Sequence, residues 1–415
     1  MTNDDTTATD SAMTGRILHL IPDEHKFSSY IFDYFENLYP GRNEFLLNQT
    51  NKEILHQHAA KFHFAVSVED FVSCALRLQK NTDIVIAHGL WSFTAMAVNQ
   101  FPESTPIGWC VFGGEVFNSR IKMSVEWVSP KTKAFVKQTR QATLANNIRD
   151  VLRLKPTAVA NTLGKGLKKL RLKRSKPSKV PLAETLQAFS RINVIAATLP
   201  QDYKFIKSEF QLSASHVWFS YYNIQQTVGA DLIESRISGN DILVGNSSDP
   251  TNLHLESFDV IAGYEENFDR IVVPLSYGSA DYGKAVGGRG QDIFGDRLEA
   301  LFDFMPRDEY NRILLRCRFA ILNHRRQQAF GTTVTLLWLG SKVFLNETST
   351  TYQYLKDLGM AVYPVSSFQS EVKKTLTDLE FKNNRSILSA EFSQARVSKG
   401  ASNLAESLFN MNTEN

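Results

Sequence analysis

Two stretches in the second half of the sequence carry residue types that bind phosphate groups. The first is Gly245-Asn-Ser-Ser-Asp249, which directly follows the apolar run 242–244. A glycine and two serines let backbone N–H groups approach an anion, and the positive end of a following helix would strengthen the attraction. An ordinary strand-to-helix turn with a Ser or Asp N-cap explains the same residues. The candidate binding residues here are Gly245, Asn246, Ser247 and Ser248.

The second stretch runs from His324 to Thr333, between two apolar segments. It contains two arginines, two glutamines and a Gly-Thr-Thr sequence that could begin a helix. A guanidinium group matches a phosphate with paired hydrogen bonds, whereas a solvated loop more commonly uses Lys, Asp and Ser. We therefore predict a phosphate site, whose candidate residues are Arg325, Arg326, Gln327, Gln328, Gly331 and Thr332.

A carboxylate in an apolar setting is the first candidate for proton transfer. Glu115 follows Gly113-Gly114 at the end of the apolar run 107–112. Burial raises the pKa of a carboxyl group, which suits a general base; a glutamate that caps the next helix is the alternative. His88 and His19 also lie at predicted strand ends, where a neutral imidazole could donate to a substrate, although a core or capping histidine is more common.

The sequence indicates neither a metal site nor a nucleoside triphosphatase. His56, His58 and His63 lack Cys or carboxylate partners at metal-ligand spacing. The segment 283–290 is expected to be a flexible loop, and it lacks the Gly-Lys-Ser/Thr ending of a P-loop.

The strands and helices that must position these residues alternate along the chain. Helical spacing of apolar residues predicts helices at 27–38, 91–98, 308–316 and 333–339. Apolar runs predict strands at 16–21, 84–87, 107–112, 193–197, 218–222, 241–245, 270–274, 319–322 and 342–346. Such alternation indicates an α/β fold with doubly wound parallel sheets, in which ligands bind at the carboxyl ends of the strands.

The alternation restarts in the middle of the chain, which predicts two α/β domains. The 415 residues, 43% hydrophobic and 21% charged, suit two globular domains of ordinary size. We expect a disordered tail at 1–13, an N-terminal domain at 14–222 with a basic insertion at about 140–190, a linker at 223–240, a C-terminal domain at 241–395 and a tail or helix at 396–415.

Cysteine usage and hydropathy indicate a cytoplasmic protein that does not span the membrane. Cys74, Cys110 and Cys317 lie far apart and in no metal-ligand spacing, which points to a reducing compartment. No run approaches the roughly 18 apolar residues that span a bilayer. The first 13 residues are polar and do not form a secretory signal.

The net charge of +3 hides one strongly basic segment at 163–179, which contains eight Lys or Arg and no acidic residue. Leu163, Leu167 and Leu170 share one helical face, a pattern typical of a helix on an anionic membrane surface. A nucleic-acid site would be expected to contain aromatic residues, which this segment lacks; a solvated linker also explains it. The candidate membrane-binding residues are Lys165, Lys168, Lys169, Arg171, Lys173 and Arg174.

Six motifs are spread along most of residues 14–365. They are Arg16-Ile-Leu-His-Leu-Ile, Ile86-Ala-His-Gly, Gly108-Trp-Cys-Val-Phe-Gly-Gly-Glu-Val-Phe, Ile242-Leu-Val-Gly-Asn-Ser-Ser-Asp-Pro-Thr-Asn, Val272-Val-Pro-Leu-Ser-Tyr-Gly and Arg326-Gln-Gln-Ala-Phe-Gly-Thr. Taken together and in this order, they resemble glycosyltransferase family 56, the bacterial 4-acetamido-4,6-dideoxygalactosyltransferases. The Val-Gly-Asn-Ser and Arg-Gln-Gln-x-x-Gly-Thr blocks are the most specific.

The resemblance implies a GT-B architecture, in which two Rossmann-like domains face each other, the active site lies in the cleft, and the N-terminal domain binds the acceptor. It implies an inverting hexosyltransferase that needs neither a metal nor a cofactor. The family's known member moves its sugar from a thymidine diphosphate (TDP) donor to an undecaprenyl-diphosphate-linked disaccharide, at the cytoplasmic face of the inner membrane, in enterobacterial common antigen synthesis. By the same resemblance, the loop 245–248 and the residues Arg326, Gln327, Gln328, Gly331 and Thr332 would hold the nucleotide diphosphate. Tyr277 is a further candidate substrate-binding residue.

The chain also departs from the family pattern. Phe112-Gly-Gly-Glu115 stands where the family typically has Trp-Gly-Ala-Asp, and the insertion at 140–190 is longer than expected. A transferase of the same fold that uses a UDP- or GDP-sugar for O-antigen or capsule is therefore one alternative. A non-catalytic protein that docks a membrane assembly is another.

Overall fold

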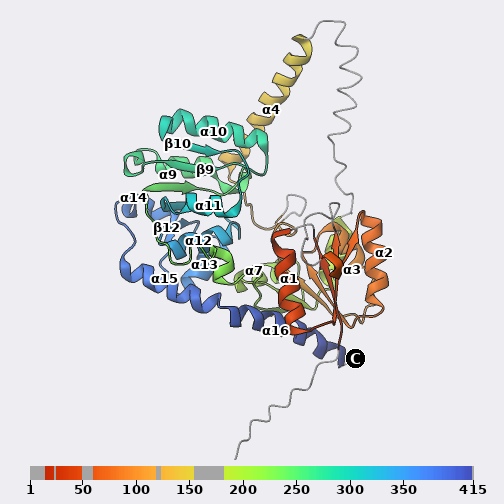
Figure 1. Ribbon diagram of the computed structural model, residues 1–415. Helices are drawn as coiled ribbons and strands as arrows, with labels where there is room; N and C mark the ends of the chain where they lie inside the picture. Colours follow the sequence, from red (N-terminus) through yellow and green to blue (C-terminus); the bar gives the residue numbers. More distant parts are fainter. Residues whose placement is uncertain (1–14, 23–24, 49–58, 118–122, 154–181, 414–415) are drawn as a thin grey trace, which may run out of the picture.

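The computed structural model contains two lobes, each built on a parallel β-sheet that is flanked by helices (Figure 1). It describes residues 15–22, 25–48, 59–117, 123–153 and 182–413. We call the part around the first sheet the first lobe and the part around the second sheet the second lobe.

The first lobe contains a seven-stranded sheet in the order β3-β2-β1-β4-β5-β6-β7, and neighbouring strands are parallel throughout. Its strands are β1 (Ile17–Ile21), β2 (Asn43–Asn48), β3 (Phe62–Ala65), β4 (Ile84–His88), β5 (Ile107–Cys110), β6 (Val194–Ala196) and β7 (Ser215–Val217). β1, β4, β5 and β6 are buried along their whole length, as expected for a sheet covered on both faces. The strand order reverses between β1 and β4, so a ligand site is expected beyond their carboxyl ends.

Amphipathic helices cover this sheet. On α2 the buried residues Phe71, Val72, Ala75 and Leu78 recur at helical spacing, and Ser67 caps the helix by accepting from the Asp70 N–H. The helices are α1 (His25–Leu38), α2 (Val68–Gln79), α3 (Ser92–Val98), α6 (Leu182–Ser190) and α7 (Pro200–Glu209), with a 3-10 turn at Ala59–Lys61.

The second lobe contains a six-stranded parallel sheet in the order β10-β9-β8-β11-β12-β13. The order reverses between β8 and β11, which again marks the expected place of a ligand. Its strands are β8 (Asp241–Val244), β9 (Ile271–Pro274), β10 (Leu298–Leu301), β11 (Cys317–Leu322), β12 (Lys342–Leu345) and β13 (Tyr363–Pro364).

The helices of this half are α8 (Ile224–Val228), α9 (His254–Ile261), α10 (Ala280–Phe294), α11 (Arg307–Leu314), α12 (Phe330–Leu339), α13 (Thr350–Asp357), α14 (Phe368–Glu371) and α15 (Asp378–Glu391). Short 3-10 turns occur at Pro250–Asn252, Glu265–Asn267, Gly295–Arg297 and Val365–Ser367. α12 is buried almost throughout and packs on α8 and α15.

Two helices cross from one lobe to the other. α4 (Pro130–Arg153) follows the first-lobe strand β5 in sequence, but Phe135 and Val136 pack into the second-lobe core. Glu256 on α9 holds the start of α4, because it accepts hydrogen bonds from the Thr132 and Ser129 hydroxyls. In Figure 1 the far end of α4 projects away from the body of the molecule.

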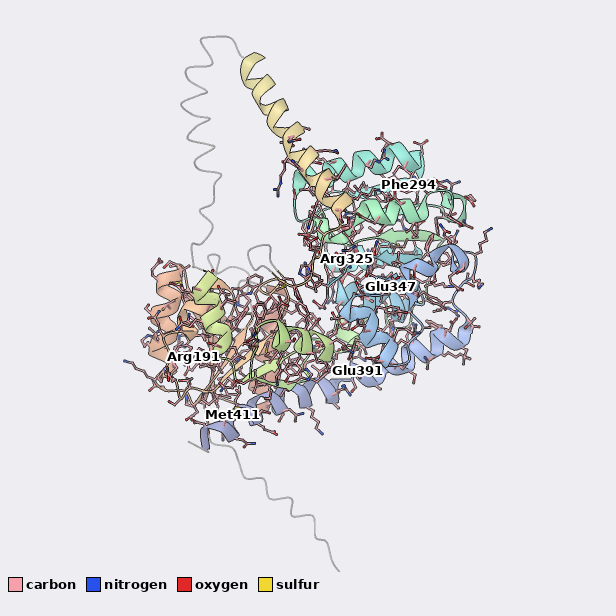
Figure 2. The ribbon with its side chains drawn as sticks, turned by 180° about the vertical axis from the view of Figure 1, so that it is seen from behind. Arg191, Phe294, Arg325, Glu347, Glu391 and Met411 are labelled. Carbon is pink, nitrogen blue, oxygen red and sulfur yellow. The ribbon has the colours of Figure 1, made fainter. Side chains whose placement is uncertain are left out.

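α16 (Gln394–Thr413) makes the opposite crossing. Figure 2 shows Glu391, just before this helix, beside the second lobe, and Met411, near its end, under the first lobe. The buried side chains on its apolar face join the core of the first lobe; they are Val397, Ala401, Leu404, Ala405, Leu408 and Phe409. The lobes are therefore connected by reciprocal packing as well as by the chain.

The structure corrects two of the predicted elements. Residues 218–222 do not form a strand, because β7 ends at Val217 and the following aromatic side chains are held by ring packing, such as Tyr221 on Phe112. Residues 283–290 are not a flexible loop but the middle of α10. A Cβ at Gly287 would lie 2.7 Å from the Phe302 ring, so glycine permits this close packing, which offsets its cost of about 1 kcal/mol within a helix.

Two predictions concern residues outside those that the structure describes. The first prediction is the disordered tail at 1–13. The second is the membrane-binding segment, whose candidate residues are Lys165, Lys168, Lys169, Arg171, Lys173 and Arg174. In the part of the chain that is described, no helix combines the length and the apolar character needed to cross a membrane.

Candidate functional site

The loop after β8 is held in a tight turn at the carboxyl edge of the second sheet. Gly245 has φ +70°, a conformation that favours glycine. The Asn252 side-chain oxygen accepts from the Asn246 backbone N–H at 2.7 Å and lies 2.8 Å from the position of a Cβ on Gly245. Glycine is therefore required here both for its backbone conformation and for lack of space.

Side chains join this loop to the loops that follow β9 and β11. The Asn246 amide donates to the Tyr277 hydroxyl at 2.7 Å and accepts from the Gln328 amide at 3.1 Å. The Gln328 oxygen in turn accepts from the Thr251 hydroxyl at 2.7 Å. Asn246, Tyr277 and Gln328, which come from three strand ends, thus form one hydrogen-bonded cluster at the edge where a ligand is expected.

The two serines of the loop are buried and serve the loop itself. Ser247 and Ser248 are each 1% exposed. Ser247 accepts from the Asn252 amide at 3.0 Å, and Ser248 donates through both its N–H and its hydroxyl to the Tyr277 carbonyl. Their side chains therefore shape the turn, and only main-chain groups at these positions could meet an anion.

The arginines lie between β11 and α12 and contact the first lobe. Arg326 stacks its guanidinium group 5.6 Å from the centre of the Phe117 ring, while Arg325 donates weakly to the Glu126 carbonyl at 3.4 Å. Figure 2 shows Arg325 where the second lobe meets the first. Gln327 also faces the first lobe, since its side-chain oxygen lies 3.1 Å from the position of a Cβ on Gly113.

Arg326 is only partly paired within the protein. It donates to the Gln327 carbonyl at 3.0 Å, but its buried Nε has no hydrogen-bond partner in the described structure. Burial lowers the pKa of Arg326, and the carboxylates of Asp249 and Asp202 oppose this effect. Gly331 and Thr332 follow in the first turn of α12, whose N–H groups point toward the same edge.

Glu115 lies inside the first lobe. It is 2% exposed, and its Oε1 accepts from the Trp109 indole N–H at 3.1 Å and from the Phe112 N–H at 2.9 Å. Burial raises its pKa, while backbone N–H groups, including that of Leu90, act in the opposite direction. These contacts fix the turn that follows β5 and do not cap a helix.

His19 and His88 form a buried chain of hydrogen bonds, and both are 0% exposed. His19 Nδ1 lies 3.1 Å from His88 Nε2, His19 Nε2 lies 3.2 Å from the Asn43 side-chain oxygen, and His88 Nδ1 lies 3.1 Å from the Tyr221 hydroxyl. The Asn43 amide nitrogen donates to Phe35 and Tyr39 carbonyls, so its oxygen must accept from His19. The chain is therefore satisfied with both imidazoles neutral.

The pKa values agree with this assignment. Burial lowers the pKa of His19 to about 3 and that of His88 well below its usual value. Neither ring reaches the surface, whereas Tyr221 and Asn43, the side chains at the two ends of this chain, are half-buried.

Asp202, at the start of α7, was not among the residues predicted from the sequence. It is 5% exposed, and burial raises its pKa to about 7, against the lowering effects of the nearby Thr350 hydroxyl and the Arg326 guanidinium. Its sequence context, Leu199-Pro-Gln-Asp202, suggests only an ordinary helix start. What distinguishes Asp202 is its charged neighbour Arg326, which comes from the other lobe.

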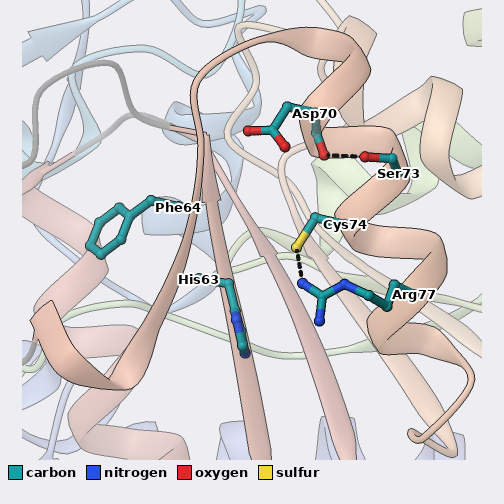
Figure 3. A pocket seen from close by; sticks show the side chains of 6 residues that line it. All are labelled: His63, Phe64, Asp70, Ser73, Cys74 and Arg77. Carbon is teal, nitrogen blue, oxygen red and sulfur yellow. Dashed lines mark hydrogen bonds between the residues drawn. The ribbon is translucent and has the colours of Figure 1, made fainter.

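Two surface cavities lie away from these residues. One, of about 350 Å³, lies between β3 and α2 and is lined by His63, Phe64, Asp70, Ser73, Cys74 and Arg77 (Figure 3). The other, of about 460 Å³, is lined by residues of α4 and α10. Within the described ranges, no group of three His, Cys, Asp or Glu side chains is placed to hold a metal ion.

Solved structures of sugar-handling enzymes share this two-lobed architecture. Sucrose-phosphate synthase from Thermosynechococcus elongatus matches 95% of this chain and 99% of its own, with a TM-score of 0.59 and 10% identity. The Anabaena HepE protein in complex with UDP and glucose matches 95% of this chain and 100% of its own, with a TM-score of 0.57 and 12% identity. A Rickettsia africae glycosyltransferase matches 95% and 99%, with a TM-score of 0.58 and 9% identity. At these identities the likeness establishes the fold, which is GT-B.

The chain therefore has the GT-B fold, with a polar cluster at the strand ends of its second lobe. A family model described as 4-alpha-L-fucosyltransferase glycosyl transferase group 56 matches residues 185–390. This match agrees with the family that the motifs of the chain resemble, and the chain is a hexosyltransferase.

Proposed function

We propose that the protein is an inverting, metal-independent glycosyltransferase that moves 4-acetamido-4,6-dideoxygalactose from a TDP donor. The acceptor would be a polyprenyl-diphosphate-linked saccharide of enterobacterial common antigen or a related surface polysaccharide. The observation that carries the proposal is the set of diphosphate-binding groups at the strand ends of the second lobe. There the Gly245 turn, the Asn246–Tyr277–Gln328 cluster and the incompletely paired Arg326 come together.

These groups suit a nucleotide diphosphate in different ways. The Gly245 turn and the first turn of α12 offer backbone N–H groups, which stabilise anions at helix starts. The Arg326 guanidinium can form two hydrogen bonds with one phosphate. When the bond between sugar and diphosphate breaks, these fixed positive groups would stabilise the charge on the leaving group. Metal independence is proposed because such groups can supply the stabilisation that a cation otherwise gives.

The acceptor and its membrane are proposed from the sequence. The basic segment 163–179 would attract the headgroups of an anionic leaflet at about 1 kcal/mol for each cation near the surface. The protein would then work as a peripheral enzyme at the cytoplasmic face of the inner membrane, where a polyprenyl-linked acceptor is anchored.

Nucleotide binding to the full chain tests this proposal. Thermal unfolding is measured with TDP, UDP, GDP and ADP, with magnesium and with EDTA. A ligand at 100 times its dissociation constant adds about 2.7 kcal/mol of stability. The proposal predicts a selective shift with TDP that EDTA does not remove. A shift with UDP or GDP instead would favour a different sugar donor, and no shift with any nucleotide would favour the non-catalytic docking protein.

A variant of Arg326 locates the binding site. Arg326→Gln removes a charged hydrogen-bond donor worth about 1.5–3 kcal/mol, so TDP affinity should fall about 10- to 150-fold. The matched control is Arg289→Gln, the same substitution at an exposed position on α10 in the same lobe. Equal TDP affinity in the two variants would place the nucleotide elsewhere.

A further inference from the structure

We infer that Asp202 is the general base that removes the proton from the acceptor hydroxyl, and that Glu115 is a structural carboxylate. This role rests on the proposed function, because it assumes an inverting transfer. It assigns the proton-transfer step to a residue opposite the diphosphate-binding groups, at the boundary between the lobes.

The position of Asp202 supports this role. α7 follows the first-lobe strand β6, and Asp202 lies in the first turn of this helix, at the carboxyl edge of the first sheet. The same helix packs on α13 of the second lobe, where Gln201 donates to Asp357 at 2.7 Å. Asp202 is therefore a first-lobe residue held against the second lobe, near Arg326 at the end of β11.

The hydrogen bonds around Asp202 and Arg326 are incomplete. Asp202 Oδ1 and Arg326 Nε are both buried and lack a hydrogen-bond partner among the described residues. The Asp202 carboxylate and the Arg326 guanidinium attract each other electrostatically. A buried polar atom left without a partner is costly, so both groups are prepared to meet polar atoms of a ligand.

The two groups match the two ends of a displacement reaction. The attacking hydroxyl needs a proton acceptor, and the leaving diphosphate needs a positive group. As the acceptor O–H bond breaks, the proton moves to Asp202, and the oxygen electron pair forms the new bond to the anomeric carbon. The bond from that carbon to the diphosphate breaks, and its electron pair leaves with the diphosphate, whose charge Arg326 stabilises. Asp202 then loses its proton to solvent.

The ionisation of Asp202 also suits a base near neutral pH. Burial raises its pKa to about 7, while Thr350 and Arg326, the groups that act on it from α13 and the β11–α12 loop, oppose the shift. General bases act best when their pKa lies near the working pH. His19, whose pKa burial lowers to about 3, is too weak a base, and the contacts of Glu115 lie within the first lobe.

The test compares Asp202→Asn with Asp357→Asn in the full chain. Both substitutions remove one carboxylate from the α7–α13 contact, but Asp357 is exposed to solvent and lies at the far end of α13. Transfer from TDP-sugar to a polyprenyl-linked acceptor is measured as kcat and KM from pH 5 to 9, and TDP affinity is measured separately. Glu115→Gln is measured alongside them.

Asp202→Asn should lower kcat about 10²- to 10⁴-fold and leave TDP affinity within about twofold. Asp357→Asn should stay within about fivefold of wild type. The wild-type kcat should fall below about pH 7 as Asp202 becomes protonated, and the residual activity of Asp202→Asn should lack this fall.

Near wild-type kcat in Asp202→Asn would overturn the assignment. So would a loss of kcat in folded, TDP-binding Glu115→Gln that equals the loss in Asp202→Asn. The failure of the proposed function appears differently, because the wild-type protein itself would then transfer no sugar from any nucleotide donor.

Discussion

Replacing Asp202 by asparagine should make the protein more stable at alkaline pH, by an amount that depends on pH in a defined way. The pKa of this carboxyl is 3.8 in an unfolded chain and about 7 in the folded protein, because burial disfavours the charged form. The folded state therefore binds the proton more tightly than the unfolded state. The wild-type protein loses stability as pH rises from about 4 to about 7, and this loss is complete above the folded pKa.

The magnitude follows from the difference between the two pKa values. The folded and unfolded pKa values of Asp202 differ by about 3, and each pKa unit corresponds to about 1.4 kcal/mol, so the loss of folding stability is about 4 kcal/mol. Asparagine resembles the protonated carboxyl and does not titrate. The free energy of unfolding of Asp202→Asn, relative to wild type, should thus rise from near zero at pH 4 to as much as about 4 kcal/mol at pH 8.

Denaturant unfolding of both proteins at several pH values between 4 and 8 measures this difference. Because every other group titrates alike in the two proteins, the difference isolates Asp202. A two-lobed chain need not unfold in one step, so the transition that includes α7 is the one to compare. A difference that does not change between pH 4 and 8 would refute the argument, since Asp202 would then have an ordinary pKa in the folded protein.

Three further substitutions test individual contacts. Tyr221→Phe removes the only hydroxyl that meets His88 Nδ1 in the described structure, so the free energy of unfolding should fall by about 1–3 kcal/mol. An unchanged denaturation midpoint would contradict the buried chain of hydrogen bonds. Gly245→Ala forces a positive φ on alanine and a contact with Asn252, so TDP affinity should fall and the free energy of unfolding should fall by at least about 1 kcal/mol. Calorimetry with TDP measures both, and wild-type affinity and stability in this variant would show that the turn does not require glycine. Glu256→Ala removes the hydrogen-bond acceptor of the Thr132 and Ser129 hydroxyls at the start of α4, so limited proteolysis in α4 should accelerate while TDP affinity stays the same. An unchanged rate of cleavage would mean that apolar packing alone holds the helix.

The sequence predicted the regular, apolar parts of the fold. β1, β4, β8 and β11 are buried on both faces and therefore appear as continuous apolar runs, which the sequence places within one or two residues. β2 and β10 were not predicted, because Asn43, Glu44 and Glu299 interrupt their apolar character. The helix α10 was missed because its glycines suggest a loop. The close packing of Gly283 on Ser248, of Gly287 on Phe302 and of Gly290 on Leu298 is visible only in the structure.

The candidate site could be predicted only in part. The residues of the second lobe follow strand ends directly, so topology alone brings the Gly245 loop and Arg326 to one edge. The catalytic candidates were harder to rank, because the sequence does not reveal how deeply His19 and His88 are buried. Asp202 had no signal in the sequence, since its significance depends on the contact between α7 and α13 and on a neighbour from the other lobe.

Sugar transfer by the purified full chain tests the central claim most directly. The protein is incubated with TDP-4-acetamido-4,6-dideoxygalactose and a polyprenyl-diphosphate-linked disaccharide in the presence of EDTA, and the products are analysed by mass spectrometry and by the anomeric coupling in NMR. The account predicts a trisaccharide in which the configuration at the transferred anomeric carbon is inverted, formed without a divalent metal. A product with retained configuration, or no product with TDP-, UDP- or GDP-sugars, would contradict it.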